Sequence, residues 1–497
     1  MTQNDLLLGG DGTQQAIQLA NMSNRHGLIA GATGTGKTVT LQVLAENFAR
    51  AGVPVFAVDA KADLSGIAKP GNAHEEVDRR NNLVGRTDYS QRQYATLHWD
   101  VFGERGHPVR TTVSEMGPDI LAALLDLNDT QAGVLYACFA IADDQGMLLL
   151  DLKDLRSLLT FMTDNAKALR QEYGNISSAS VGAIQRRLLV LEQQGGESFF
   201  GEPALQLSDL MLKDFSGHGV ISLLDGERLL RDSPNLYAAF VLWLISELFE
   251  ELPEAGDLDK PKLVVFFDEA HLLFKNMPKG LLDKVEQVFR LIRSKAVGIY
   301  LVTQSPTDIP DAILGQLGMK VQHALRAFTP KDQKTIRGVV QGLRNDSGMD
   351  VAETLTSLGV GEALISTLDQ SGTPCSVIAA TIAPPESRIG PLTDAERTAS
   401  LANSPIGTRY DEVIDRESAY ELLQQKAAEN ARLLEAEERA QAEAREREKE
   451  AKARERRKPR GRSRQGIGEA MLKSAARSVG RSLGSKLVRG LLGSLLK

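Results

Sequence analysis

The sequence predicts an α/β fold with a mostly parallel sheet, a helical insertion and a C-terminal helical tail. Three observations favour this class. Short apolar runs alternate with helical patterns along most of the chain, a glycine-rich segment separates the first apolar run from the first helix, and a later apolar run ends in two acidic residues. Such alternation is typical of parallel sheets, because each crossover helix packs back on a face of the sheet.

Composition narrows the class of protein. The chain has 497 residues, 42% of them hydrophobic, which is enough for two or three domains with buried cores. The N-terminus has no basic region followed by an apolar run, and the most apolar helical stretch, 236–249, is too short to span a bilayer. The two cysteines lie far apart and lack metal-ligand spacing. We therefore expect a cytoplasmic protein without a disulfide framework or a zinc site.

Charge is spread unevenly along the chain. The formal net charge is −7, yet residues 452–497 carry 14 Lys or Arg and only 2 Glu, so the remainder is strongly acidic. A basic segment on an acidic body favours a polyanionic partner, which is nucleic acid, an acidic membrane surface or the acidic body itself.

The glycine-rich segment GATGTGKT has the spacing of a phosphate-binding loop: Gly, four residues, Gly, Lys and then Ser or Thr. An apolar run before it predicts a strand, and residues 39–50 after it show helical spacing. The glycines let backbone N–H groups face phosphates at the start of that helix. We expect Lys37 to reach the β- and γ-phosphates of ATP and Thr38 to place its hydroxyl on Mg²⁺. The predicted nucleotide-binding residues are Gly31, Ala32, Thr33, Gly34, Thr35, Gly36, Lys37 and Thr38.

The sheet is expected to continue at 53–61, a buried strand that ends on Asp59, with Lys61 and Asp63 in the loop beyond it. Residues 71–215 combine polar loops with apolar helical patterns, which indicates a mainly helical insertion. Strand patterns then return at 219–224, 262–270, 298–304, 321–328, 362–368 and 375–382.

Two of these strands end on polar residues suited to hydrolysis. The run KLVVFFDEAH carries Asp268 and Glu269 to the C-terminal end of a buried strand, where ligands bind in parallel sheets. Asp268 is expected to hold the Mg²⁺ shell and Glu269 to orient and polarise the attacking water, whereas His271 is expected to be structural. Gln304, at the end of GIYLVTQ, is expected to sense the γ-phosphate or the water, with a strand-end cap as the alternative.

Three segments follow the core. Residues 386–416 are expected to be a linker, and 417–458 a solvated charged helix or a disordered segment, because 435–457 lacks the apolar seam of a coiled coil. The tail, 459–497, has an apolar residue at every fourth position from Ile467 and basic residues on the opposite helical face. It is expected to dock on a neighbouring subunit or another protein, with an acidic membrane surface or DNA as alternatives.

The set GATGTGKT, VVFFDEAH, LVTQ and a late strand with an internal arginine resembles the HerA–FtsK branch of hexameric P-loop motor ATPases. The segments 109–118, 127–156 and 359–374 further resemble a bacterial HerA-like family, the YjgR family. The resemblance implies a RecA-like P-loop NTPase core formed by residues 1–70 and 216–385, Mg²⁺-dependent ATP hydrolysis, and a homo-oligomer in the form of a hexameric ring.

The resemblance also implies an arginine from the next subunit, which would neutralise charge that develops on the transferred phosphoryl group. The matching position is Arg326, and Arg290 and Arg293 are the alternatives. One departure is the N-terminus: HerA-type motors carry a β-barrel before the phosphate loop, whereas in this sequence the loop begins at residue 31, which leaves room for a hairpin at most.

Three functions are compatible with these patterns. The first is a DNA translocase or helicase, the second a protein-handling or membrane- and secretion-associated ATPase, and the third a regulatory ATP-binding assembly with slow turnover. DNA-stimulated hydrolysis separates the first from the others, and turnover without DNA separates the second from the third.

Overall fold

The computed structural model describes residues 5–456 with the exception of 257, 276, 278, 327 and 328. The chain divides into two compact units. The first comprises Met1–Leu127 and Leu189–Asp415, and the second comprises Asn128–Leu188 and Arg416–Lys497. All of the described strands belong to the first unit.

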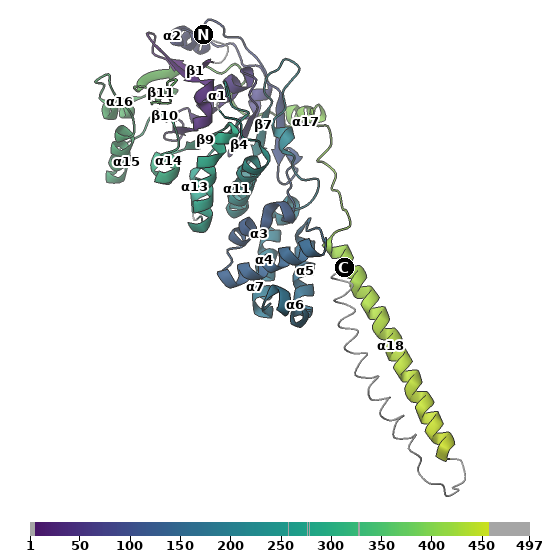
Figure 1. The fold of residues 1–497 in the computed structure, drawn as a ribbon. Helices are drawn as coiled ribbons and strands as arrows, with labels where there is room; N and C mark the ends of the chain where they lie inside the picture. The colour runs from purple at the N-terminus through teal and green to yellow at the C-terminus, as the bar shows by residue number, and fades with distance from the viewer. Residues whose placement is uncertain (1–4, 257, 276, 278, 327–328, 457–497) are drawn as a thin grey trace. The chain divides into compact units, whose positions relative to one another are not determined.

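A twelve-stranded sheet organises the first unit (Figure 1). Its order is β2-β1-β12-β11-β10-β3-β9-β8-β4-β7-β5-β6. From β10 to β6 neighbouring strands are parallel, whereas β11, β12, β1 and β2 extend the sheet as antiparallel strands. The strands are β1 Asp5–Gly10, β2 Gln15–Leu19, β3 Gly27–Ala30, β4 Val55–Asp59, β5 Thr96–Asp100, β6 His107–Pro108, β7 Ile221–Asp225, β8 Leu263–Phe267, β9 Val297–Thr303, β10 Met319–His323, β11 Glu362–Ser366 and β12 Ile378–Ile382. The mostly parallel α/β fold predicted from the sequence is confirmed.

Helices connect these strands and build the second unit. In the first unit they are α1 Lys37–Arg50, α2 Glu75–Val84, α3 Val113–Leu124, α8 Glu197–Phe199, α9 Leu207–Leu210, α10 Glu227–Asp232, α11 Pro234–Glu251, α12 His271–Phe274, α13 Lys279–Leu291, α14 Asp311–Leu314, α15 Pro330–Gln341, α16 Val351–Ser357 and α17 Asp394–Ala402. The remaining helices are α4 Asp129–Asp144, α5 Leu152–Asp164, α6 Ala166–Tyr173, α7 Ser178–Leu191 and α18 Ala419–Arg456.

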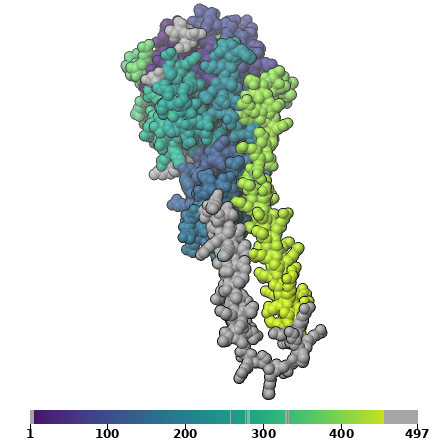
Figure 2. Space-filling model, turned by 45° about the vertical axis from the view of Figure 1, so that its right-hand side comes forward, coloured from purple at the N-terminus to yellow at the C-terminus, as the bar shows by residue number. Residues whose placement is uncertain are grey.

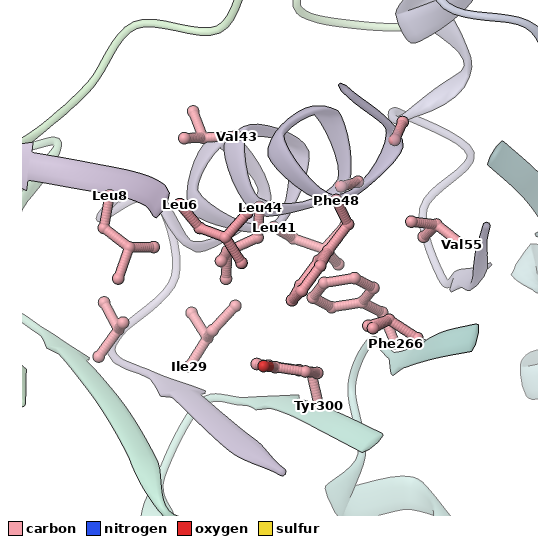
Figure 3. Packing of buried hydrophobic residues seen from close by; sticks show 14 of the residues in the cluster. Leu6, Leu8, Ile29, Leu41, Val43, Leu44, Phe48, Val55, Phe266 and Tyr300 are labelled. Atoms are coloured by element: carbon pink, nitrogen blue, oxygen red, sulfur yellow. The ribbon is translucent and has the colours of Figure 1, made fainter. Parts of the chain in front are cut away.

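Helix α1 packs on one face of the sheet (Figure 3). Its residues Leu41, Leu44 and Phe48 are fully or almost fully buried, as their helical spacing predicts. The Phe48 ring lies 5.6 Å from the Tyr300 ring on β9 and 6.3 Å from the Phe266 ring on β8, measured between centroids. This packing fixes the helix that begins at the phosphate loop against the strands that carry the acidic pair and Gln304.

Replacing Phe48 with alanine should therefore lower the free energy of unfolding of the first unit by about 3–5 kcal/mol, because a buried aromatic ring leaves a cavity. Both tryptophans, Trp99 and Trp243, lie in this unit, so urea denaturation followed by tryptophan fluorescence reports on it. Leu433→Ala, at a half-exposed position of α18, is the matched control and should leave the transition unchanged. An equally small effect of both substitutions would contradict the packing of α1 on the sheet.

Helix α11 covers the opposite face of the sheet. Its Phe240 ring lies 6.3 Å from the Phe56 ring of β4, between centroids, and most of its residues are buried. The expectation of a buried core helix at 236–249 is confirmed. Among the described helices, none combines the length and the apolar composition needed to cross a membrane.

Two segments differ from the expected boundaries. Residues 71–215 contain β5, which pairs in parallel with β7 inside the main sheet, besides their helices. The sequence pattern is weak there because Thr96, His98 and Asp100 alternate with Leu97 and Trp99, so the strand reads as a polar loop. Because β5 pairs with β7, the sheet includes part of residues 71–215. These residues were expected to form a mainly helical insertion.

The expected linker 386–416 is also different, because it packs on the first unit. The Glu386 side chain is buried, accepts a hydrogen bond from Tyr94 Oη at 2.5 Å, and lies 3.0 Å from Arg50 Nη1. Arg86 forms a further ion pair with it. A buried carboxylate needs such partners, and they anchor the beginning of the segment that was expected to be a linker.

In the second unit, Asp154 of α5 holds the start of α18. Its carboxylate accepts hydrogen bonds from Ser418 Oγ at 2.5 Å and from the Tyr420 backbone N–H at 2.9 Å. Beyond Leu423 the described side chains of α18 are mostly exposed, and the helix lies at the surface in the space-filling view (green to yellow in Figure 2). Of the two alternatives for 417–458, the described residues, up to Arg456, therefore have the charged helix. The tail, 459–497, lies outside the described residues.

Candidate nucleotide-binding site

The glycine-rich loop leaves the sheet at the end of β3 and enters α1 at Lys37, as predicted. Its backbone is tied to two neighbouring segments: Gly31 N–H donates to Thr303 O at 3.3 Å, and Ala32 N–H donates to Ala324 O at 3.0 Å. A Cβ atom at Gly31 would stand 2.5 Å from His323 Cβ, so only glycine permits this approach. The loop therefore has a curled shape set by the strands on either side.

Lys37 spans the loop. Its Nζ donates to the carbonyl oxygens of Gly31 at 2.8 Å and Ala32 at 3.1 Å, and its side chain is buried. Burial lowers the pKa of Lys37, and the nearby carboxylates of Glu269 and Asp268 act in the opposite direction. The loop and the acidic pair, distant in sequence, lie at the same edge of the sheet because β3 and β8 both pair in parallel with β9.

The acidic pair follows directly after β8. Burial raises the pKa of Asp268 to about 6, and repulsion from the Glu269 carboxylate adds to the shift. Glu269 has a φ of 48°, in the left-handed region, and its N–H donates to Asp268 Oδ1 at 2.9 Å. Two adjacent buried carboxyl groups favour positive charge nearby, which Lys61 supplies to Glu269 and which a divalent ion would supply to Asp268.

A magnesium ion fits the residues present at this edge. Thr38 is half-buried at the second position of α1, where the hydroxyl ligand of a phosphate loop is required, and Asp268 supplies a carboxylate. Within the described part of the chain no group of three His, Cys, Asp or Glu residues could hold a metal by itself. Mg²⁺ bound with phosphates needs only one or two protein ligands, which matches this set.

Glu269 is held by side chains from two neighbouring strands. Lys61 Nζ, beyond the end of β4, lies 3.1 Å from its Oε1, and Gln304 Nε2, beyond the end of β9, lies 3.4 Å from Oε1 and 3.3 Å from Oε2. His271 Nδ1 lies 3.4 Å from Oε2. The structure thus brings Gln304 to Glu269 and adds Lys61, which the sequence showed only as a loop residue.

The carboxylates around Lys61 raise its pKa. Burial acts to lower its pKa, but the hydrogen bond and the Coulombic attraction to Glu269, together with Asp268 and Asp63, outweigh burial and raise it. Asp59, which ends β4 as predicted, is almost completely buried and accepts hydrogen bonds from the N–H groups of Asp63 and Leu64. These bonds fold the loop that carries Lys61 toward the site.

His323 is a further residue that sequence reasoning missed. Its Nε2 lies 2.8 Å from Thr40 Oγ1 on α1, and its Nδ1 lies 2.9 Å from Glu362 O on β11. Burial lowers the pKa of His323 to about 4, so the ring is neutral near pH 7. It joins α1, the helix that follows the phosphate loop, to β10 and β11. No spacing in the sequence signals this role, because only strand order brings these groups together.

The expectation that Arg326 lies inside a strand is wrong. Strand β10 ends at His323, so Arg326 lies in the loop beyond it and not inside a strand. The chain leaves the sheet because Ala324 O accepts from the phosphate loop and Leu325 N–H donates to Leu355 O at 3.4 Å. Arg326 is exposed, and its Nη1 donates to Thr356 O at 2.7 Å.

Arg290 and Arg293, the alternatives to Arg326, lie elsewhere. They precede β9, at the edge of the sheet opposite to the phosphate loop, because parallel strands begin at one edge and end at the other. Arg326 is on the carboxyl edge that carries the loop of its own chain. Of the three, Arg326 alone shares an edge with the nucleotide-binding residues.

A glycine-rich loop of this spacing after one parallel strand, with an acidic pair after another, is the arrangement of a P-loop NTPase. The chain belongs to the family described as the helicase HerA-like C-terminal family, whose model matches residues 4–497. The HerA-like resemblance predicted from the sequence is confirmed, whereas the finer resemblance to the YjgR family stays a prediction.

Two curated relatives come from Methanocaldococcus jannaschii. A probable helicase is 31% identical over 125 residues, which is 24% of this chain and 22% of the relative. The probable DNA double-strand break repair helicase HerA is 33% identical over 107 residues, 21% of this chain and 20% of the relative. The chain therefore matches about a fifth of the length of each.

Solved structures with a similar arrangement include two bacterial proteins. The conjugative coupling protein TrwB, in an unbound form, has a TM-score of 0.48 at 18% identity over 76% of this chain and 88% of its own. VirB4 of Thermoanaerobacter pseudethanolicus also has a TM-score of 0.48, at 15% identity over 76% of this chain and 95% of its own.

Proposed function

We propose that this protein is a Mg²⁺-dependent ATPase that hydrolyses ATP by direct attack of water and uses the cycle to move DNA through a ring of identical subunits. The observation that carries the proposal is the set of contacts around Glu269. Its carboxylate lies against Lys61 and Gln304, and its backbone N–H donates to Asp268 Oδ1, at the edge of the sheet where the phosphate loop leaves β3. A base, a metal ligand and a phosphate cradle at one edge suit phosphoryl transfer to water.

Each group has a part in the reaction. The loop N–H groups and Lys37 bind the β- and γ-phosphates, and the start of α1 adds its positive dipole end. Thr38 and Asp268 are the residues that would hold Mg²⁺, which when bound supplies positive charge to the phosphates. Glu269 orients the water and accepts its proton as the oxygen attacks the γ-phosphorus, while Gln304 and Lys61 hold the Glu269 carboxylate in place.

Family membership supports the rest of the proposal. The family takes its name from a helicase, and both curated relatives are named as helicases, which favours DNA as the track. A hexameric ring would bring Arg326 of one subunit to the site of the next, where its exposed guanidinium stabilises the transition state. The alternative functions are protein handling and slow regulatory turnover. The following test distinguishes both from a DNA motor.

The test compares ATP turnover by the full chain and by Lys37→Ala, with Mg²⁺, in the presence and absence of duplex DNA. Removing one charge that contacts the reacting phosphates should lower the turnover rate by roughly 10²–10³-fold and weaken ATP binding. Lys449→Ala, on the exposed part of α18, is the matched control and should turn over normally.

The results separate the alternatives. A higher rate of ATP hydrolysis by the unaltered chain in the presence of DNA supports the motor. An equal rate of hydrolysis with and without DNA favours protein handling. Tight ATP binding with almost no turnover favours a regulatory assembly. An unchanged rate in Lys37→Ala would show that GATGTGKT is not the phosphate-binding loop.

A further inference from the structure

A second concave site lies in the first unit, at the edge of the sheet opposite to the phosphate loop. It is a pocket of about 440 Å³. Arg25 and His26 come directly before β3, Arg290 and Arg293 come before β9, and Lys320 is the second residue of β10. The pocket is therefore formed where three parallel strands begin, and none of the proposed nucleotide-binding residues contributes to it.

All of the charged side chains in the lining are basic. Three arginines and one lysine face the pocket, and no Asp or Glu is among its lining residues. Within the described residues, Arg25, Arg290 and Arg293 form no ion pair with a carboxylate. His26 adds no charge, because burial lowers its pKa to about 4.

Two of the cations are built into the wall. Arg25 is partly buried and lies against the turn at Gly372, where a Cβ atom would stand 2.0 Å from its Nη1. Lys320 Nζ donates to Gly342 O at 2.9 Å, and burial lowers the pKa of this lysine. Holding a lysine charge partly away from water is costly, and an anion in the pocket would offset that cost.

The other two cations form an open rim. Arg290, in the last turn of α13, and Arg293, in the turn that follows, are both exposed and are three residues apart. Side chains at this spacing lie on the same side of a helix. Guanidinium groups match phosphate oxygens with paired N–H donors, which makes them the preferred ligands of phosphate.

We propose that this basic pocket binds backbone phosphates of a nucleic acid. The proposal rests on the DNA motor function above and assigns it a contact surface. A single free phosphate would be satisfied by Arg25 and Lys320 in the wall, whereas the exposed pair on the rim extends the positive surface outward, as a chain of phosphates requires. The site recognises the charge of the backbone and not the base sequence, because backbone contacts carry no sequence information.

The pocket is joined to the nucleotide site by short strands. β3 has four residues, about 13 Å of extended chain, and it connects Arg25 and His26 to Gly31 of the phosphate loop. β10 connects Lys320 to Ala324, whose carbonyl oxygen accepts the Ala32 N–H. A nucleic acid bound in the pocket therefore contacts the N-terminal ends of β3 and β10, and the C-terminal ends of the same two strands support the phosphate loop.

The experiment measures duplex DNA binding by the full chain over a range of salt, using fluorescence anisotropy and a non-hydrolysable ATP analogue. The test variant is Arg290→Ala with Arg293→Ala. The matched control, Arg231→Ala with Arg337→Ala, removes the same charge from exposed positions outside the pocket. All four residues are exposed, so thermal melting and nucleotide affinity should be unchanged in both double variants.

Each neutralised phosphate contributes about 0.9 to the slope of log affinity against log salt. Loss of two contacts should therefore lower that slope by about 2 and lower the affinity by roughly 10–100-fold near 0.1 M salt. The control double variant should keep the slope of the unaltered chain. An unchanged slope in the Arg290 and Arg293 variant, with DNA still bound, would overturn the pocket assignment alone.

A second measurement identifies the source of the phosphate. Phenylglyoxal modifies accessible arginines, and mass spectrometry reports the protection of Arg25, Arg290 and Arg293. Protection by duplex DNA supports the proposal, whereas protection by inorganic pyrophosphate but not by DNA makes this a site for small phosphates and overturns it. If the unaltered chain hydrolyses ATP but binds no DNA at any salt, the DNA motor function fails first, and this inference fails with it.

Discussion

Replacing Arg326 with alanine should lower the ATP turnover rate by roughly 10³–10⁵-fold while nucleotide affinity changes little, because an arginine finger acts on charge that develops only in the transition state. The structure is compatible with such a role, since Arg326 is exposed and lies in the loop beyond β10 at the nucleotide edge of the sheet. Steady-state turnover and direct nucleotide binding, measured on the same preparation, separate the two effects. Arg337→Ala, another exposed arginine in the same unit, is the matched control.

A mixing experiment decides whether Arg326 acts between subunits. Lys37→Ala subunits lack the phosphate contact but keep Arg326, and Arg326→Ala subunits have the opposite defect. If one subunit's arginine completes its neighbour's site, mixed assemblies contain junctions with both groups and recover part of the activity. Verified mixed assemblies without recovery would show that Arg326 acts within its own chain or has no part in the reaction.

Replacing Glu269 with glutamine should leave ATP bound and lower turnover by roughly 10²–10⁴-fold. The amide preserves the shape of the side chain but is a far weaker acceptor for the proton of the attacking water. It also loses the ion pair with Lys61, whose Nζ lies 3.1 Å from Oε1. Single-turnover hydrolysis with ATP prebound measures the chemical step directly.

Lys61→Met separates these two consequences of the Glu269 substitution. If the carboxylate itself is the base, Lys61→Met retains much more activity than Glu269→Gln, because it removes only the partner that holds the base. Equal losses in both variants would mean that the ion pair, and not the base, accounts for the effect. Loss of ATP binding in Glu269→Gln would instead assign Glu269 to the metal ligands.

The phosphate loop, the strand that follows α1 and the acidic strand end could all be predicted from sequence, since each is a local pattern. The spacing of GATGTGKT, the helical spacing of Leu41, Leu44 and Phe48, and the apolar run before Asp268 involve residues that are neighbours in the chain. Backbone conformation and burial within one element follow from such short-range chemistry. The α/β class therefore followed from local patterns in the amino-acid sequence, and the HerA-like family followed from the resemblance of its motifs.

Only the tertiary structure decided which side chains meet. Lys61 and Gln304 reach Glu269 because β4 and β9 flank β8 in the sheet, and strand order is not encoded in the local pattern of any one strand. The same reason explains why Arg25 and Lys320 share a pocket although nearly three hundred residues separate them. Local periodicity determines an element and its buried face, whereas long-range pairing of strands determines the neighbours of each side chain, and hence the chemistry of the site.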